Sequence, residues 1–95
     1  MKQCTTLEEV RSEIDQIDRG VVVLITERLE YVRQAGHIKQ TRTEIRDPAR
    51  VDDIITKVMA ETRRSGGNHK LMALIYRVMV EWCITYELAV FDNSR

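Results

Sequence analysis

The sequence predicts an all-α fold of three helices, long, short and medium in length, within one domain of residues 1–95. Three observations carry this prediction. Apolar residues recur at steps of three and four over long stretches, which is the period of an α-helix. No stretch alternates as a strand would, and no internal repeat is present. The one proline, Pro48, stands at an expected helix start rather than inside a helix.

The first predicted helix runs from about residue 6 to about residue 40. A capping box formed by Thr5 or Thr6 with Glu8 or Glu9 marks its start. Its apolar residues form one heptad seam with a single charge, that of Arg28. The seam positions are Leu7, Val10, Ile14, Ile17, Val21, Leu24, Arg28, Tyr31, Ala35 and Ile38. Such a helix is about 50 Å long, whereas a compact chain of this size has a radius of gyration near ~12 Å. We therefore expect it to pack along a second copy of the chain.

The second predicted helix begins at Asp47 and Pro48, a good N-cap followed by proline at the first helical position. Its apolar stripe consists of Val51, Ile54, Ile55, Val58 and Met59. The helix is expected to end within the polar stretch ETRRSGG, and residues 66–68 form the turn that follows.

The third predicted helix spans about residues 69 to 91 and carries two neighbouring stripes. One contains Leu71, Ile75, Val78, Trp82 and Ala89; the other contains Tyr76, Val80, Cys83 and Glu87. Glu87 is anomalous because an apolar or neutral residue is expected there. We assign the large aromatics Tyr31, Tyr76 and Trp82 to the core.

Composition excludes several function classes. The chain has 15 Lys+Arg against 15 Asp+Glu, so it lacks the cationic excess that nucleic acid or an anionic membrane surface requires. No signal-peptide or membrane-spanning stretch is present. Cys4 and Cys83 lie at opposite ends, and neither they nor His37 and His69 have metal-ligand spacing. We expect a cytoplasmic protein with no metal and no cofactor.

The sequence offers no nucleophile beside a base, no paired carboxylates and no glycine-rich phosphate loop. An enzyme of this kind would act by positioning a small polyanion and stabilising its developing charge. Arg28 and Lys39 are suited to this, because on a helix they fall within about 20° of each other. Arg11 lies about 100° from Arg28, so it would reach the same pocket only from an antiparallel partner helix.

Simpler interpretations of these residues stay open. Arg28 could pair with an acid such as Asp18 across an interface, in a non-catalytic helical dimerisation module. Lys39 could be a solvated surface charge, Glu87 an exposed acid near a helix end, and Cys83 a small core hydrophobe.

The stretch LEEVRSEIDQIDRGVVVLITERLEYVRQAGHIKQ followed by IRDPARV resembles the all-helical chorismate mutase family, including its isochorismate-pyruvate lyase branch. The likeness covers nearly the whole chain. It implies an intertwined homodimer whose long first helices build two active sites, each using an arginine of the other subunit. It also implies a small dianionic substrate, chorismate or isochorismate.

The resemblance also implies roles, position by position. Arg28 and Arg11 of the partner subunit would bind the two substrate carboxylates, with Arg50 assisting. Lys39 would donate to the ether oxygen as its bond to carbon breaks. Asp47 would meet the ring hydroxyl.

Three further positions bear on the substrate. Glu87 falls where many relatives have a glutamine that donates a second hydrogen bond to the ether oxygen, and Cys83 falls where some mutases have a serine near the ring carboxylate. Val51 replaces a glutamate that accepts from the ring hydroxyl in typical mutases, and valine accepts nothing. The leading expectation is a chorismate mutase that rearranges chorismate to prephenate. The alternative is an isochorismate-pyruvate lyase that yields salicylate and pyruvate.

Overall fold

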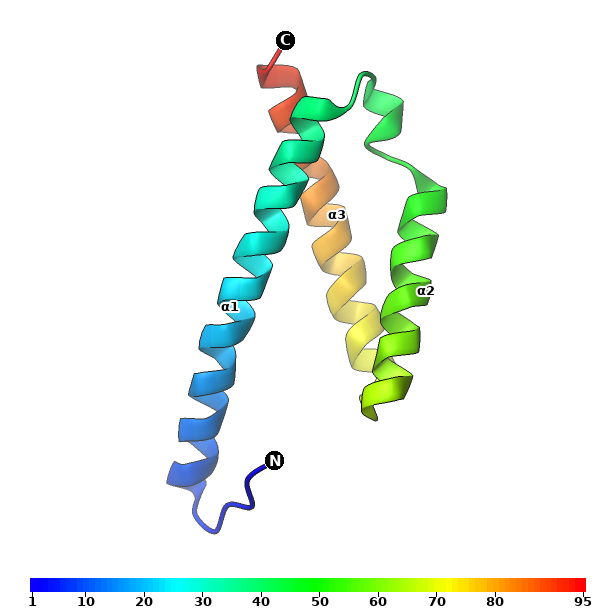
Figure 1. Ribbon diagram of the computed structural model, residues 1–95. Coiled ribbons are helices and arrows are strands. Elements are labelled where there is room, and N and C mark those ends of the chain that lie inside the picture. The colour runs from blue at the N-terminus through cyan, green and yellow to red at the C-terminus, as the bar shows by residue number, and fades with distance from the viewer. The chain divides into compact units, whose positions relative to one another are not determined.

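A computed structural model describes all residues 1–95 and contains three α-helices, one short 3₁₀ helix and no strand (Figure 1). The elements are α1 (Leu7–Ile38), η1 (Arg42–Glu44), α2 (Pro48–Ser65) and α3 (His69–Asn93). The predicted all-α fold with long, short and medium helices is confirmed. None of the helices carries an apolar stretch that would cross a lipid bilayer. The chain divides into two compact units, Met1–Tyr31 and Val32–Arg95, which are described in turn.

The first unit contains the start of α1, which is capped by side chains as predicted. The backbone N–H of Glu9 donates to Thr6 Oγ1 at 3.1 Å, and the backbone N–H of Thr5 donates to Glu9 Oε2 at 3.3 Å. The first of these bonds satisfies one of the donors that a helix N-terminus leaves open, and the second holds the residue before the cap. Thr6 is therefore the capping residue, and the acid that completes the cap is Glu9.

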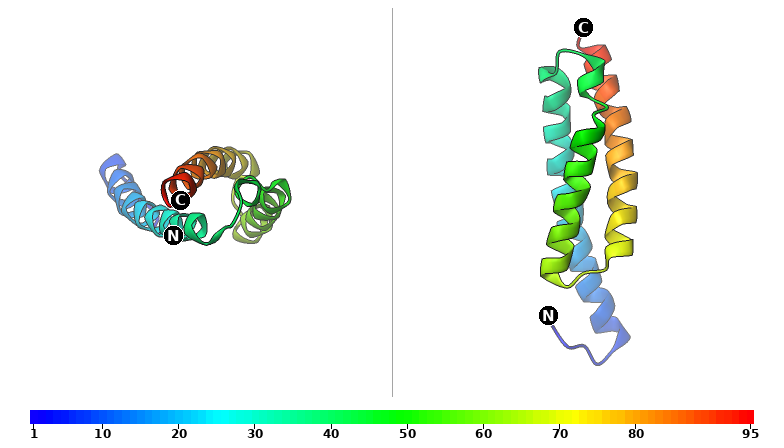
Figure 2. Two further views of the ribbon diagram at one scale, coloured as in Figure 1. Left: turned by 90° about the horizontal axis from the view of Figure 1, so that it is seen from above. Right: turned by 90° about the vertical axis from the view of Figure 1, so that its right-hand side faces the viewer.

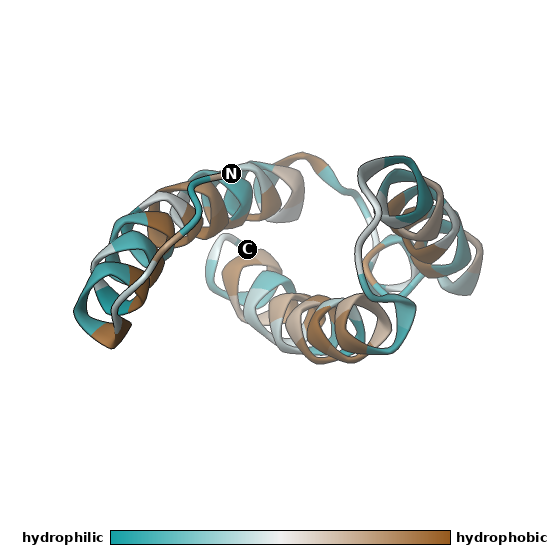
Figure 3. Ribbon diagram, turned by 90° about the horizontal axis from the view of Figure 1, so that it is seen from below, coloured by the Kyte–Doolittle hydropathy of each residue, from teal (hydrophilic) through white to brown (hydrophobic).

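The apolar seam of α1 is exposed in the single chain. Hydrophobic and hydrophilic residues alternate along the helix ribbon (Figure 3), and every apolar seam residue of the first unit is exposed. Ile17 and Leu24 are each 65% exposed, and Tyr31 is 70% exposed. The assignment of Tyr31 to the core is therefore wrong for the chain by itself, because the seam has no covering element within its own unit.

In the second unit, local capping explains where α2 and α3 begin and end. Asp47 Oδ1 accepts the backbone N–H groups of Ala49 at 3.1 Å and Arg50 at 3.3 Å, and Pro48 is the first helical residue. Gly66 ends α2 in the left-handed conformation with φ 72°, which glycine adopts without strain. Asn68 then accepts the Leu71 N–H at 3.0 Å and starts α3. The two helices lie side by side beyond this turn (Figure 2).

The loop between α1 and α2 contains a short helix that the sequence analysis did not predict. Thr41 caps η1, and Glu44 Oε1 accepts the backbone N–H groups of Gln40 and Thr41 at 3.0 Å each. Arg46 pairs with Glu81 on α3 at 2.5 Å, and Arg42 pairs with Asp92. These contacts hold the loop against α3.

The core of the second unit is small and lies between the loop, α2 and α3. Its buried members are Ile45, Val80, Ile84 and Phe91, with Val51, Ile54 and Leu88 packed against them. Burial of these side chains supplies the main driving force for docking α2 and the loop onto α3.

The two stripes predicted on α3 differ in solvent exposure. Val80, Cys83 and Glu87 on the second stripe are buried. The first stripe is exposed: Val78 is 63% and Trp82 59% exposed, and the Trp82 ring stacks on Tyr86 with 5.6 Å between centroids. The assignment of Trp82 to the core is wrong for the same reason as that of Tyr31.

Candidate active site

The only polar side chains buried in the chain are Thr62 and Glu87, and Glu87 faces a lysine. Lys39 Nζ lies 2.7 Å from Glu87 Oε2, and the two side chains are 27% and 9% exposed. The simpler interpretation of Glu87 as an exposed acid is therefore wrong. Lys39 is equally not a solvated surface charge. Residues 48 positions apart in the sequence form one partly buried ion pair.

Glu87 Oε2 makes no hydrogen bond in spite of this contact. Its polar contact is the ion pair with Lys39 Nζ at 2.7 Å. A buried carboxylate oxygen without a hydrogen bond is unfavourable for folding. Such a group is typical of a binding or catalytic site, where a ligand completes the bonding.

The backbone N–H and the carbonyl oxygen of Lys39 each form a hydrogen bond. Its N–H donates to Ala35 O at 2.9 Å, which continues the helical bonding of α1. Its carbonyl oxygen accepts from Arg95 Nη2 at 2.5 Å, and the Arg95 guanidinium lies 4.0 Å over the Phe91 ring. A cation at this position also suits the partial negative charge of a helix C-terminus.

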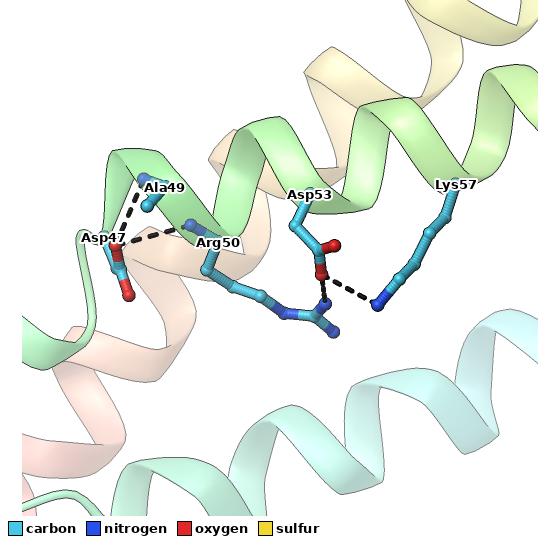
Figure 4. A network of polar contacts seen from close by, with 5 residues as sticks. All are labelled: Asp47, Ala49, Arg50, Asp53 and Lys57. Carbon is cyan, nitrogen blue, oxygen red and sulfur yellow. Dashed lines mark hydrogen bonds and ion pairs between the residues drawn. The ribbon is translucent and has the colours of Figure 1, made fainter.

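Asp47 and Arg50 already have partners on α2 (Figure 4). One carboxylate oxygen of Asp47 caps the helix. Arg50 Nη1 lies 2.5 Å from Asp53 Oδ2, and Lys57 Nζ lies 2.9 Å from the same oxygen. Hydrogen bonds from Lys57 and then from Arg50 lower the pKa of Asp53. Arg50 is thus held by an exposed acid and does not join the Lys39–Glu87 pair.

Val51 and Cys83 occupy apolar surroundings. Val51 is partly buried and packs against the core of the second unit. Cys83 forms no disulfide, is 8% exposed, and lies one helical turn before Glu87 on α3. Burial of Cys83 agrees with a small core residue, and its spacing places it on the same side of α3 as Glu87.

The two arginines expected to bind carboxylates belong to the first unit. Arg11 is exposed on α1, and Arg28 is half-buried at its seam position. The structure thus brings together Lys39 and Glu87 within the second unit, with Cys83 one turn before Glu87 on α3. Asp47 caps the start of α2, Arg50 and Val51 lie in its first turn, and Arg11 and Arg28 lie on α1.

Comparison with known proteins matches the sequence to one family. A family model described as chorismate mutase type II matches residues 10–88, which is most of the chain and includes Lys39 and Glu87. The chain belongs to the chorismate mutase type II family. It is therefore an enzyme of the chorismate mutase type, with isochorismate pyruvate lyase as the closely related alternative.

Two curated relatives are named for these two activities. The isochorismate pyruvate lyase of Pseudomonas aeruginosa is 23% identical over 94 residues, covering 99% of this chain and 93% of that protein. The bifunctional chorismate mutase/prephenate dehydratase of Aquifex aeolicus is 29% identical over 85 residues, covering 85% of this chain. The match spans only 24% of the Aquifex protein.

Sequence reasoning missed two residues beside the Lys39–Glu87 pair. Gly36 is the one buried residue of α1, and Arg95 caps the Lys39 carbonyl. A glycine inside a long helical pattern was the available signal for Gly36, because glycine destabilises a helix interior by roughly 1 kcal/mol relative to alanine. No comparable signal marks Arg95, whose partner is 56 residues away.

Proposed function

We propose that this chain, as one domain of residues 1–95, catalyses the rearrangement of chorismate to prephenate in active sites shared by two copies. The observation that carries the proposal is the partly buried Lys39–Glu87 pair, with its hydrogen-bond-free Oε2, at positions covered by the family match. The rearrangement is pericyclic and needs no covalent intermediate. Its demands are a bound reactive conformer and stabilisation of charge that builds on the ether oxygen.

Lys39 and Glu87 have complementary parts in this reaction. The ammonium group of Lys39 donates to the ether oxygen as a compact point charge. Glu87 donates a second hydrogen bond, which requires its carboxyl group to be protonated because a carboxylate only accepts. The substrate's ether oxygen would thus take the place of the direct contact between Lys39 and Glu87.

Arginines meet the two substrate carboxylates. Arg28 and Arg11 of the partner subunit bind them with their planar, bidentate guanidinium groups. Arg50 assists after it exchanges Asp53 for substrate. Asp47 meets the ring hydroxyl through the carboxylate oxygen that does not cap α2, and Cys83 lies near the ring carboxylate.

The exposed seam of α1 supports the homodimer in which these sites form. Eight of the ten seam positions carry large apolar residues that are 39–72% exposed, and the other two positions are Arg28 and Ala35. A helix with such an uncovered stripe gains stability when a second copy buries it. Nothing in the pattern favours nucleic acid or a membrane as a partner, and two cysteines that form no disulfide suit the expected cytoplasm.

Ile17→Glu tests the dimer. It places a charge at a seam position that is 65% exposed in the single chain. We expect sedimentation velocity to show monomers and the activity to fall together. Arg19→Glu is the control, since it lies about 200° away around the helix. A dimer that persists with Ile17→Glu would contradict the shared-site proposal.

The isochorismate-pyruvate lyase activity is the second candidate, and Val51 favours it. An apolar side chain that packs against the core accepts nothing from a ring hydroxyl. The full-length match to the Pseudomonas lyase also supports this candidate.

Assays with the two substrates side by side test both candidates. Loss of chorismate is followed by ultraviolet absorbance, and salicylate by fluorescence after addition of isochorismate. We expect the purified chain to turn over chorismate faster than isochorismate, and Lys39→Ala to turn it over about 10²- to 10³-fold more slowly than the wild type. Lys70→Ala, at an exposed lysine of α3, serves as control. A larger kcat/KM for isochorismate would reverse the order, and no turnover of either would refute the proposed function.

A further inference from the structure

Gly36 occupies a helix interior without needing the conformational freedom of glycine. It lies within α1 and is the one buried residue of that helix, whereas the left-handed conformation in this chain belongs to Gly66 alone. Any residue would adopt the backbone angles of Gly36, and alanine would favour the helix more. The reason for glycine must therefore be space.

The space beside Gly36 is filled by α3. A Cβ atom built at Gly36 would lie 3.0 Å from Val90 Cγ1, 3.2 Å from Val90 Cβ and 3.2 Å from the backbone carbonyl oxygen of Glu87. All three distances are shorter than ordinary van der Waals contact. The valine side chain has some freedom to rotate, but the Glu87 carbonyl belongs to the helix backbone. A side chain at position 36 would therefore push α3 away by a few tenths of an ångström.

The residue that would be pushed is the one that faces Lys39. Glu87 contributes its carbonyl oxygen to the contact with Gly36 and its carboxyl group to the contact with Lys39 at 2.7 Å. Lys39 follows Gly36 by three residues, which places it on the neighbouring turn and the same side. The residues 32–38 of α1 lie against the end of α3 at this point (Figure 1).

We propose that Gly36 is a positioning residue that sets the separation of Lys39 and Glu87 by allowing the backbones of α1 and α3 to approach. The inference rests on the proposed function, since it assigns a purpose to the same pair. Two donors that converge on one oxygen atom must be held to about half an ångström. Displacement of reacting groups by about 1 Å costs on the order of 100-fold in rate.

Gly36→Ala tests this inference, and Gly20→Ala is a matched control on the same helix. A Cβ at Gly20 meets nothing within 4 Å. We expect Gly20→Ala to raise the melting temperature and to leave kcat and KM within about twofold, because alanine favours a helix and nothing has to move. For Gly36→Ala we expect kcat to fall about tenfold or more while KM changes much less, because the carboxylate-binding arginines do not take part in this contact.

A second variant separates positioning from general loss of stability. Gly36→Ala/Val90→Ala removes the closest clash, that with Val90 Cγ1, and retains those with the Cβ of residue 90 and with the Glu87 carbonyl. We expect this double variant to fold and to recover part of the lost kcat. If Gly36→Ala loses activity only in proportion to its folded fraction, and the second substitution restores none, the inference is wrong.

A measurement that does not depend on catalytic activity distinguishes failure of this inference from failure of the proposed function. The NMR chemical shift of the Glu87 side-chain carboxyl carbon, measured at one fixed pH without substrate, reports on the neighbouring ammonium group of Lys39. We expect this chemical shift to change in Gly36→Ala and to stay as in the wild type in Gly20→Ala. An unchanged chemical shift in Gly36→Ala would refute the inference, whereas an inactive wild type, together with a changed chemical shift in Gly36→Ala, would refute only the proposed function.

Discussion

Arg50 Nη1 lies 2.5 Å from Asp53 Oδ2, one helical turn along α2. The same carboxylate oxygen accepts from Lys57 Nζ at 2.9 Å, so Asp53 holds two cations on the exposed side of the helix. Arg50, which we expect to assist substrate binding, therefore already forms an ion pair with Asp53 of its own helix. Binding of a dianion must compete with this contact.

Asp53→Asn removes that competition. We expect KM for chorismate to fall by no more than a few-fold, because ion pairs between exposed side chains are weak. Lys57→Gln is the control, since it leaves the contact between Arg50 and Asp53 in place and should not lower KM. Steady-state kinetics of the three proteins provide the measurement, and an unchanged KM in Asp53→Asn would remove Arg50 from substrate binding.

Lys39→Ala should lower kcat about 10²- to 10³-fold, because one charged donor to the developing oxyanion is lost. It should also lower the melting temperature, since the partly buried carboxylate of Glu87 loses its counter-ion. The double variant Lys39→Ala/Glu87→Gln should regain thermal stability without regaining activity. Recovery of both would mean that Lys39 acts only on stability.

Glu87→Gln should flatten the dependence of activity on pH. In the wild type we expect activity to fall as the pH rises, because only the protonated carboxyl group donates to the ether oxygen, whereas an amide donates at every pH. Glu81→Gln, an exposed glutamate of the same helix, is the control and should keep the wild-type profile. If kcat of the wild type did not change with pH, Glu87 would not be a hydrogen-bond donor to the ether oxygen.

Arg28→Ala distinguishes an enzyme from a dimerisation module. If Arg28 binds a substrate carboxylate, kcat/KM should fall about tenfold to a hundredfold while the dimer and its melting temperature persist. If Arg28 pairs with an acid such as Asp18 across an interface, the melting temperature should fall instead. Differential scanning calorimetry beside the kinetic assay separates these outcomes.

The contact between Arg46 and Glu81 predicts a contribution to acid stability. The hydrogen bond from Arg46, together with its charge, lowers the pKa of Glu81. A lowered pKa in the folded state stabilises the protein above the unfolded-state pKa, and this contribution is lost as the pH falls through the lowered value. The melting temperatures of wild type and Glu81→Gln should therefore differ at neutral pH and converge in acid. Asp52→Asn, at an exposed acid of α2, is the control variant.

Much of the fold was predictable because its signals are local. Thr6, Asp47 and Asn68 cap helices through backbone groups two or three residues away, and Gly66 ends α2 in the conformation that glycine favours. The short helix η1 was missed because it lies in a polar loop that has no apolar pattern. Its cap depends on the Glu44 side chain, which accepts a hydrogen bond from the Thr41 N–H. Tyr31 and Trp82 were misassigned because periodicity identifies an apolar face and not the element that covers it.

The sequence by itself determined three helices, their starts and ends, the seam of α1 and the unusual charges at Arg28 and Glu87. Each depends on a periodic pattern or on bonds between near neighbours in the chain. Only the tertiary structure decided that Glu87 is buried against Lys39 and that Gly36 lies against Val90 and the Glu87 carbonyl. Those contacts depend on how closely two helices pack, and that distance is set by side-chain volume across more than 45 residues of intervening chain.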